Sequence, residues 1–230
     1  MYKKRLDGRK PSEFRKASAE VGIIKNAVGS ARFQIGKTSA YAAVYGPREI
    51  IPRHKMSAKS GVLRCNYNMM PFSGMGDRVR PGNNRRSTEI SYVTESSLLP
   101  VLDLKKFPNA GVDVFIELDQ TDAGSRCAGI TAASLALADA GFAMKDLVVA
   151  VAVGSVDGTL VVDLSYEEED YDAPVVDIPF AIIPSTGEIT LLQMDGKLSQ
   201  ETLMKAYDMA KKAADEIYDI MKSALKKRYD

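Results

Sequence analysis

The chain has 230 residues, of which 45% are hydrophobic and 27% are charged, an ordinary balance for a protein that buries a sizeable core. Its 31 basic and 30 acidic residues leave a net charge of +1, so bulk charge predicts no partner. A single histidine disfavours mechanisms that need a histidine base or a histidine-rich metal site, and Cys65 and Cys127 form no spaced motif. The sequence contains no signal-peptide core and no apolar run of membrane-spanning length, so we expect a cytoplasmic protein.

Charge is segregated along the chain. Residues 3–16 hold seven basic and two acidic side chains, and residues 46–90 hold nine basic and three acidic ones. Residues 157–177 hold eight acidic side chains and no basic one. This pattern is typical of a basic surface for a polyanion beside an acidic pocket for a metal or proton transfer, and equally of solvated loops.

Strands and helices alternate in two similar runs. After a basic N-terminal arm (residues 1–18), strands are expected at 31–35 and 39–45, paired through a turn at Gly36, and at 62–68. A loop rich in Gly and Pro (71–84), a helix beginning near Arg86, a strand at 112–118 and a helix of small residues at 127–140 follow. The second run predicts four strands and a long amphipathic helix, at residues 147–153, 160–164, 180–183, 189–194 and 199–228. We therefore expect an α+β fold in a single domain, 1–230, with a pseudo-repeat.

Residues 119–141, DQTDAGSRCAGITAASLALADAG, predict a tight turn that leads into a helix. Backbone N–H groups at a helix start attract anions, and Arg126 adds a charged fork suited to phosphate oxygens. The alternative is structural: Gly124 supplies a permissive turn, Ser125 caps the helix and Arg126 reaches into water. These residues alone do not decide between the two readings.

Arg85 and Arg86 stand at the start of the other predicted helix, where their charge opposes the helix dipole. An anionic ligand would resolve that conflict, although exposed arginines are tolerated there at small cost. In the acidic segment, Asp170 and Asp177 flank a loop and are candidates for holding a divalent metal or acting as a general acid, or belong to a solvated acidic turn. Arginines together with a carboxylate–metal centre fit phosphoryl chemistry better than acyl transfer.

Six segments resemble one family in order along nearly the whole chain. They are LDGR (6–9), AAVYGPRE (42–49), NYNMMPFS (66–73), RRSTEIS (85–91), DVFIELDQTDAGSRCAGITAASLALADAG (113–141) and LLQMDG (191–196). Together they resemble the RNase PH family, and within it the catalytic RNase PH-like subunit of the archaeal exosome.

The resemblance implies a duplicated β-α fold with mixed sheets packed against helices. It also implies a hexameric ring of three heterodimers with a catalytically inactive paralogue, together with RNA-binding cap subunits. The implied activity is 3′→5′ phosphorolysis of single-stranded RNA, reversible as 3′ tailing, with inorganic phosphate as co-substrate and Mg²⁺ or Mn²⁺ as cofactor. Phosphate arrives already ionised, so such an enzyme needs positioning and charge neutralisation rather than an activated nucleophile.

The resemblance also implies roles for individual residues. Gly124, Ser125 and Arg126 match the phosphate-binding loop, with Arg126 also catalytic, and Arg85 and Arg86 match an arginine pair that grips the RNA backbone or the attacking phosphate.

Asp177 matches a catalytic, metal-binding aspartate, and Asp170 matches a second one. Seven positions separate these two aspartates, one more than in the family pattern, so Asp172 stays open as an alternative to Asp170.

Arg64 and Tyr67 match an RNA-backbone contact and a base-stacking aromatic. Taken alone, a tyrosine on a strand is more often part of a core. Two rival functions remain: an inactive scaffold subunit that binds RNA without cleaving it, and a stand-alone homohexamer that trims transfer-RNA precursors.

Overall fold

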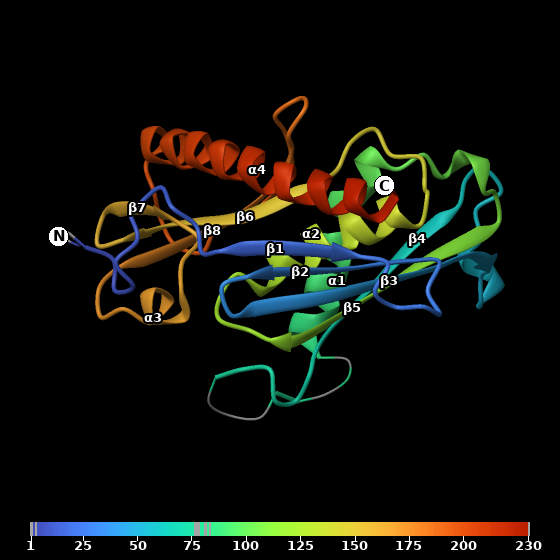
Figure 1. Cartoon of the computed structure of the whole chain (residues 1–230), viewed down its shortest axis with the longest axis horizontal. Helices are drawn as coiled ribbons and strands as arrows, with labels where there is room; N and C mark the ends of the chain where they lie inside the picture. The colour runs from blue at the N-terminus through green and yellow to red at the C-terminus, as the bar shows by residue number, and fades with distance from the viewer. Residues whose placement is uncertain (1, 3, 76–78, 81, 83, 230) are drawn as a thin grey trace.

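The computed structural model of the chain describes residues 2, 4–75, 79–80, 82 and 84–229. Within these residues the strands form a five-stranded sheet, in the order β1-β2-β3-β5-β4, and a four-stranded sheet, in the order β7-β6-β8-β9. The C-terminal helix α4 runs along one side of the molecule over β6 and β1 (Figure 1). The predicted loop 71–84 and the predicted arm 1–18 lie partly outside the described residues.

The first sheet joins three antiparallel pairs and one parallel pair. Its strands β1 to β5 are Ala17–Val21, Gly29–Ile35, Thr38–Glu49, Val62–Met69 and Ala110–Gln120. The alternation in β2 buries Ala31, Phe33 and Ile35 against the core. β2 and β3 pair through a turn at Gly36, whose φ of 57° favours glycine, as the sequence predicts.

The second sheet is antiparallel throughout. Its strands β6 to β9 are Val149–Val156, Thr159–Val162, Val175–Ile183 and Glu188–Leu192. Every residue of β6 is buried, because β6 lies between β7 and β8 and also packs against helices α2 and α4. A run of apolar residues with no alternation is typical of such a central strand.

Helix α2 (Ser125–Asp139) packs against strands of both sheets, and nearly all of it is buried. Its small residues permit this close packing: a Cβ on Gly129 would lie 3.3 Å from Ile116 and 3.4 Å from the ring of Tyr67. One core cluster contains apolar residues from both sheets, α2 and α4. The helix predicted from small residues is therefore the central packing element.

Three more helices surround this centre: α1 (Arg85–Leu98), α3 (Tyr166–Glu169) and α4 (Gln200–Tyr229). Short 3₁₀ segments occupy Arg53–Lys55, Leu99–Val101 and Leu104–Lys106. Asn84 and Ser87 form a capping box at the start of α1. The predictions omitted β1 and α3, which are short. Within the described part of the chain, no helix has both the length and the apolar composition needed to cross a bilayer.

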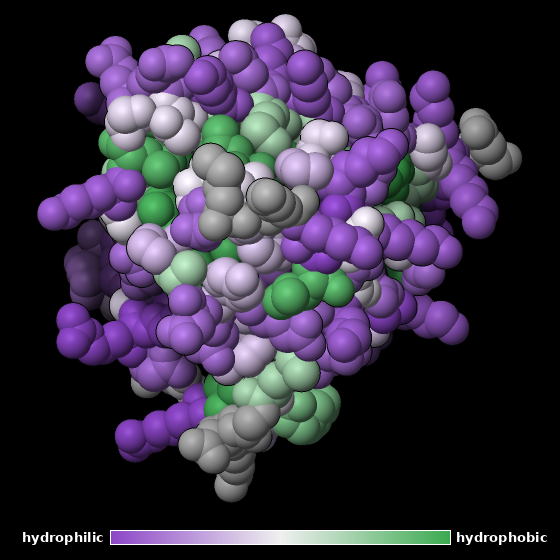
Figure 2. Space-filling view, turned by 90° about the vertical axis from the view of Figure 1, so that its left-hand side faces the viewer, coloured by the Kyte–Doolittle hydropathy of each residue, from purple (hydrophilic) through white to green (hydrophobic). Residues whose placement is uncertain are grey.

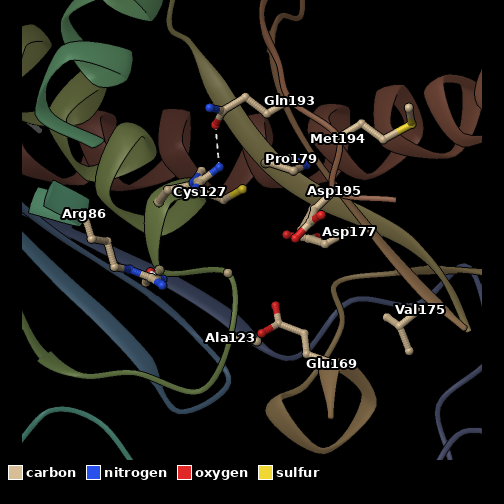
Figure 3. Close-up of a pocket in the computed structure, with 14 residues that line it drawn as sticks. Arg86, Ala123, Cys127, Glu169, Val175, Asp177, Pro179, Gln193, Met194 and Asp195 are labelled. Atoms are coloured by element: carbon tan, nitrogen blue, oxygen red, sulfur yellow. Dashed lines mark hydrogen bonds between the residues drawn. The ribbon is translucent and has the colours of Figure 1, made fainter. Parts of the chain in front are cut away.

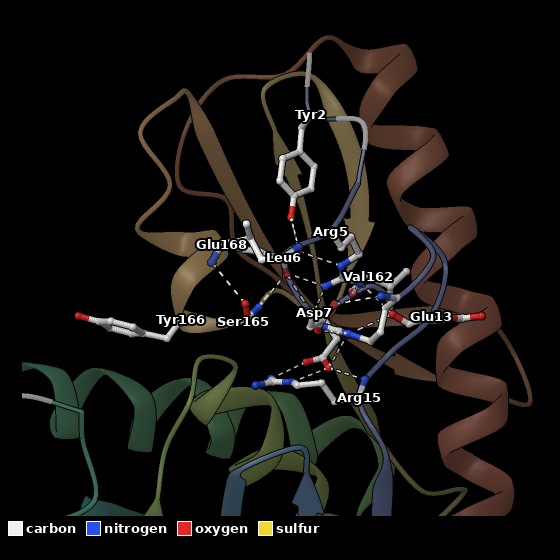
Figure 4. Close-up of polar contacts among 12 residues, drawn as sticks. Tyr2, Arg5, Leu6, Asp7, Glu13, Arg15, Val162, Ser165, Tyr166 and Glu168 are labelled. Atoms are coloured by element: carbon white, nitrogen blue, oxygen red, sulfur yellow. Dashed lines mark hydrogen bonds and ion pairs between the residues drawn. The ribbon is translucent and has the colours of Figure 1, made fainter.

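The basic arm and the acidic segment pair with each other (Figure 4). The side chain of Arg5 is 1% exposed and donates to Glu168 at 2.8 and 2.6 Å and to the Val162 carbonyl at 2.7 Å. The Tyr2 hydroxyl donates to Glu168 at 2.7 Å. The face that carries the arm is mostly hydrophilic (Figure 2), and these charges lie buried beneath it. Part of the charge segregation in the sequence is therefore an internal ion-pair cluster.

Candidate active site

A pocket of about 620 Å³ opens where the N-terminus of α2 meets the second sheet (Figure 3). It combines backbone amides, two arginines and three carboxylates. Its lining residues are Arg86, Ala123, Gly124, Ser125, Arg126, Cys127, Ala152, Glu169, Val175, Asp177, Pro179, Gln193, Met194 and Asp195.

The turn before α2 is held in a left-handed conformation. Ala123 and Gly124 have φ values of 58° and 62°, and Gly124 is the N-cap without a side-chain hydrogen bond to the first turn. Thr38 pins this turn from the first sheet, because its Oγ1 donates to the Ala123 carbonyl at 2.7 Å and accepts from the Asp122 N–H at 2.9 Å. The first-turn amides of α2, with no capping side chain, suit an anion.

Two of the four predicted arginines, Arg86 and Arg126, line the pocket. Arg86 donates from Nη2 to Ser125 Oγ at 3.2 Å, so it reaches the turn from the start of α1. Arg126 donates to Gln193 Oε1, and its Nη2 lies 3.6 Å from Glu89 Oε2. Arg85 is exposed and lies outside the lining. Gly124, Ser125, Arg126 and Arg86 thus line one pocket, and their binding roles stay predictions.

The carboxylates come from β8, the segment after β9, and the end of α3. Asp177 and Asp195 exchange backbone hydrogen bonds of 3.2 and 2.9 Å. Burial raises the pKa of Asp177 to about 6, against the opposing effect of Arg126. Glu169 is exposed as a residue, but its carboxyl group points into the pocket (Figure 3). Burial and the charge of Asp177 raise the pKa of Glu169 to about 7.

The carboxylate wall suits a hard divalent cation. Asp177 Oδ1 is buried and accepts no hydrogen bond, and an orphaned carboxylate oxygen is a position that a cation fills. Among the described residues, no three His, Cys, Asp or Glu side chains form a preformed metal cluster. The site therefore fits an ion that is held by one or two carboxylates and completed by water and substrate oxygens, as Mg²⁺ is.

Asp170, the predicted partner of Asp177, is exposed at the C-cap of α3 and lies outside the lining. Asp172 is exposed as well and also lies outside it. The carboxylate from this loop that lines the pocket is Glu169, which sequence reasoning did not single out. The sequence also gave no role to Asp195, although it stands in the LLQMDG segment.

Tyr67 does not fit the stacking role expected of it. Its side chain is 3% exposed, belongs to the core cluster and packs under α2 at Gly129, so neither ring face is open to a base. We therefore correct the prediction: Tyr67 is a packing residue in this structure. Arg64 lies outside the pocket, where its guanidinium donates to the buried Asp113 at 2.6 and 2.9 Å.

The fold and the pocket define a class of protein, and comparison with known families agrees. Residues 13–143 match domain 1 of the 3′ exoribonuclease family and residues 146–213 match domain 2 of the same family. The chain belongs to this family. The first match spans all five strands of the first sheet, and the second spans all four strands of the second sheet. That the two halves form a single domain stays a prediction.

Particular relatives are more informative. The chain is 52% identical over 226 residues to the exosome complex component Rrp41 of Thermococcus kodakarensis, covering 98% of this chain and 90% of that protein. It is 47% identical over 225 residues to Rrp41 of Methanopyrus kandleri, covering 98% and 93%.

Two solved structures share the fold at 24% sequence identity. Rice Rrp46 superposes with a TM-score of 0.83, covering 96% of this chain and all of that one. A chain of the Archaeoglobus fulgidus exosome with RNA bound to the active site has a TM-score of 0.79, covering 94% and 92%.

Proposed function

We propose that this chain is the catalytic subunit of an exosome and shortens RNA from its 3′ end by phosphorolysis. One observation carries the proposal: the free amides at the α2 N-terminus, two arginines and the carboxylate of Asp177 line the same pocket. An anion site beside a metal-binding carboxylate is what phosphoryl transfer needs. The Rrp41 relatives, which are exosome complex components, support the assignment to an exosome.

The lining offers no activated protein nucleophile. Cys127 lies at the pocket wall, but burial raises the pKa of its thiol, so it stays protonated at neutral pH. Ser125 Oγ accepts a hydrogen bond from Arg86, and no histidine lines the pocket. The attacking group is therefore a small molecule rather than a side chain, and inorganic phosphate fits the anion site.

In the proposed reaction, a phosphate oxygen forms a bond to the phosphorus of the terminal nucleotide. The bond from that phosphorus to O3′ of the preceding nucleotide breaks, and O3′ takes a proton. The products are a nucleoside diphosphate and an RNA one nucleotide shorter, so the reverse reaction adds 3′ nucleotides. The α2 amides, Ser125 and Arg126 hold the attacking phosphate, while Arg85 and Arg86 bind the RNA backbone or that phosphate.

The pKa values divide the carboxylate roles. A pKa of about 6 leaves Asp177 mostly ionised at neutral pH, so we assign metal binding to Asp177. A pKa of about 7 gives Glu169 both protonation states there, so it is the candidate donor of the proton to O3′. A divalent metal, Mg²⁺ or Mn²⁺, held by Asp177 with Asp195 or the predicted Asp170, would neutralise charge on the phosphoryl oxygens.

The test is product analysis with an assembled ring. A 3′-tailed RNA incubated with the ring, Mg²⁺ and inorganic phosphate should release nucleoside diphosphates, and omission of phosphate should stop the release. Release of nucleoside monophosphates in phosphate-free buffer would show that water is the attacking group and would rule out phosphorolysis.

The strongest alternative is an inactive ring subunit that binds RNA without cleaving it. The convergence of Ser125, Arg126 and Asp177 in one pocket favours the enzyme, because a scaffold has no need for a metal-binding carboxylate beside an anion site. A hexameric ring with an inactive paralogue and RNA-binding cap subunits remains part of the proposal, as does the contact of Arg64 with single-stranded RNA. The cytoplasmic location stays a prediction.

A further inference from the structure

We propose that Arg15 is a positioning residue that fixes the phosphate-binding turn and α3 on opposite sides of the pocket. The proposal rests on the proposed function, since it concerns the binding of the co-substrate phosphate. Arg15 belongs to the basic arm and lies outside the pocket lining. It acts through Asp122, the residue that precedes Ala123 and Gly124.

One end of Arg15 is anchored to the second sheet. Its backbone N–H donates to Asp163 Oδ2 at 2.8 Å, its Nε donates to the same oxygen at 2.8 Å, and its Nη2 donates to Oδ1 at 2.7 Å. The side chains of Arg15 and Asp163 are 9% and 3% exposed. Asp163 directly follows β7 and donates its own N–H to the Ala152 carbonyl at 2.7 Å. A buried two-pronged ion pair of this kind is a rigid attachment.

The other end of Arg15 holds the turn. Its Nη1 donates to the backbone carbonyl of Asp122 and lies 3.3 Å from that residue's carboxylate. A Cβ on Gly124 would lie 3.7 Å from Arg15 Nη2, so the guanidinium sits directly against the turn. Together with Thr38, which binds the turn from the first sheet, Arg15 fixes it from two sides.

Asp122 extends this attachment to α3. Its Oδ1 accepts from the N–H of Tyr166, the first residue of α3, at 3.0 Å, and the last residue of α3 is Glu169. The same guanidinium therefore restrains the amides on one side of the pocket and a carboxylate on the other.

The conformation of the turn explains why it needs restraint. Ala123 adopts a φ of 58°, a left-handed conformation that is strained for a residue with a side chain. Without Arg15, relaxation of the turn would redirect the first-turn amides away from the phosphate. Binding of phosphate should therefore weaken. Binding of RNA, which depends on other groups as well, should weaken less.

The neighbouring Arg5 provides a matched control. It is also a buried arginine of the arm, 3% exposed, and it bonds to Glu168 and to the Asp163 carbonyl at 2.8 Å. Its hydrogen bonds go to the arm, to the end of β7 with the residue that follows it, and to α3. None of these bonds goes to the turn at 122–125. Loss of Arg5 should therefore lower stability without a specific effect on phosphate.

The experiment measures initial rates of the assembled ring against phosphate concentration and, separately, against RNA concentration. Arg15→Gln should raise the KM for phosphate about 10-fold or more and change kcat much less, because misplaced binding groups lose affinity of that order. Arg15→Lys should recover part of the loss. Arg5→Gln should lower Tm and leave the KM for phosphate within about twofold of the wild type, as expected for a group away from the site.

Each outcome has a distinct meaning. A folded Arg15→Gln ring with an unchanged KM for phosphate overturns the inference, and so does an Arg5→Gln ring whose KM rises equally. If Arg15→Gln does not fold, Asp122→Asn replaces it, since it keeps an oxygen for the Tyr166 N–H and removes the charge that faces Arg15; an unchanged KM there also overturns the inference. A wild-type ring that needs no phosphate contradicts the proposed function instead.

Discussion

Asp177 and Glu169 face each other across the pocket, and burial raises the pKa of both; the charge of Asp177 raises the pKa of Glu169 further, and the charge of Asp195 raises that of Asp177. Asp177 pairs with Gly154 and Asp195 through its backbone, so its position is fixed by the sheet. Glu169 ends a helix of four residues and depends on the loop that carries it. The fixed position of Asp177 suits metal binding, and the position of Glu169 beside a loop suits proton exchange.

Asp177→Asn should abolish phosphorolysis, because the amide removes the charge that a divalent ion needs. RNA binding should stay nearly intact, since the arginines are unchanged. Rates of diphosphate release and RNA retention on a filter measure the two effects separately. Glu167→Gln is the matched control: this exposed carboxylate of α3 lies outside the pocket, so the variant should keep activity within a few-fold. A normal rate for Asp177→Asn would move the role to Asp170 or Asp172.

The pH dependence should reveal the ionised form of Asp177. With a pKa of about 6, the Asp177 carboxylate proposed to bind the metal becomes protonated as pH falls, so kcat/KM should drop about tenfold per pH unit below 6. It should fall again above about pH 7, where Glu169, the proposed proton donor, loses its proton. The profile should be recorded at saturating phosphate and at a fixed Mg²⁺ concentration below saturation, because saturating metal keeps its carboxylate ligand ionised to lower pH. The ring should be shown to be folded throughout. Activity that instead rises as pH falls through 6 would make Asp177 the proton donor.

Glu169 and Tyr67 show what the sequence could not predict about individual residues. The one-residue difference in spacing raised doubt about Asp170 but could not select Glu169, because an irregular loop has no period that assigns side chains to a face. Tyr67 matched a motif position, yet its burial depends on α2 packing against its ring at Gly129, a contact between distant parts of the chain. In both cases tertiary packing decides the outcome.

Strand β2 packs tightly against the C-terminal end of α2 and so helps to fix the direction in which the N-terminus of α2 points. A Cβ on Gly29 of β2 would lie 2.2 Å from the backbone nitrogen of Ala140, and the Ser30 N–H donates to Asp139 at 2.9 Å. Strand and helix thus touch backbone to backbone. This contact explains why a glycine is needed there although its φ is ordinary.

Gly29→Ala should lower the free energy of unfolding by about 1–3 kcal/mol, because overlapping backbone atoms must move apart. Gly141→Ala is the control at the same end of α2. That glycine has a φ of 76° and open space around it, so only backbone strain of about 1 kcal/mol is expected. Denaturant unfolding of both variants gives the comparison. Equal losses would mean that the close approach of β2 to α2 carries no special cost.

The docked arm should make stability depend on pH. Burial alone would raise the pKa of Glu168, but hydrogen bonds from Arg5, Ser165 and Tyr2 outweigh it, and the pKa is lowered. The ionised carboxylate therefore stabilises the folded state above the unfolded pKa of about 4.5, and this contribution is lost as pH falls further.

Glu168→Gln should lose about 3–5 kcal/mol of unfolding free energy at pH 7, because it leaves Arg5 buried without its ion-pair partner. The difference between wild type and variant should shrink as pH falls below 4.5. Chemical denaturation across pH 3–7 measures both. A difference that stays constant with pH would show that the carboxylate charge is not what holds the arm.

At the scale of the whole molecule, local patterns predicted the α+β architecture, because alternation in β2 and the apolar stripe of α4 are set by neighbouring residues. The turn that leads into α2 was predicted for the same reason, as its Gly, Ser and Arg are consecutive, and its binding of an anion stays a prediction. The pairing of the arm with the acidic segment was not predicted, since Arg5 and Glu168 are 163 positions apart. Charge complementarity between distant segments indicates that they can meet, but not that they do.

Assembly is the remaining property of the whole chain. Large apolar side chains are exposed on the isolated subunit, among them Ile51 at 76%, Phe72 at 73% and Tyr92 at 70%. Scattered exposure of this kind is ordinary in monomers, so it does not define an interface. The stronger reason to expect assembly is that the Rrp41 relatives are exosome complex components.

Native mass measurement should find the purified chain alone below the size of a hexamer, and a hexamer of three heterodimers after mixing with its paralogue. Phosphate-dependent release of diphosphates should appear with the larger species, because a ring can keep RNA near the pocket between cleavage steps, which raises its effective concentration. The same chain, diluted into the same buffer without the paralogue, controls for self-association during the assay. A chain that forms an active hexamer by itself would contradict the heteromeric ring and support the stand-alone enzyme instead.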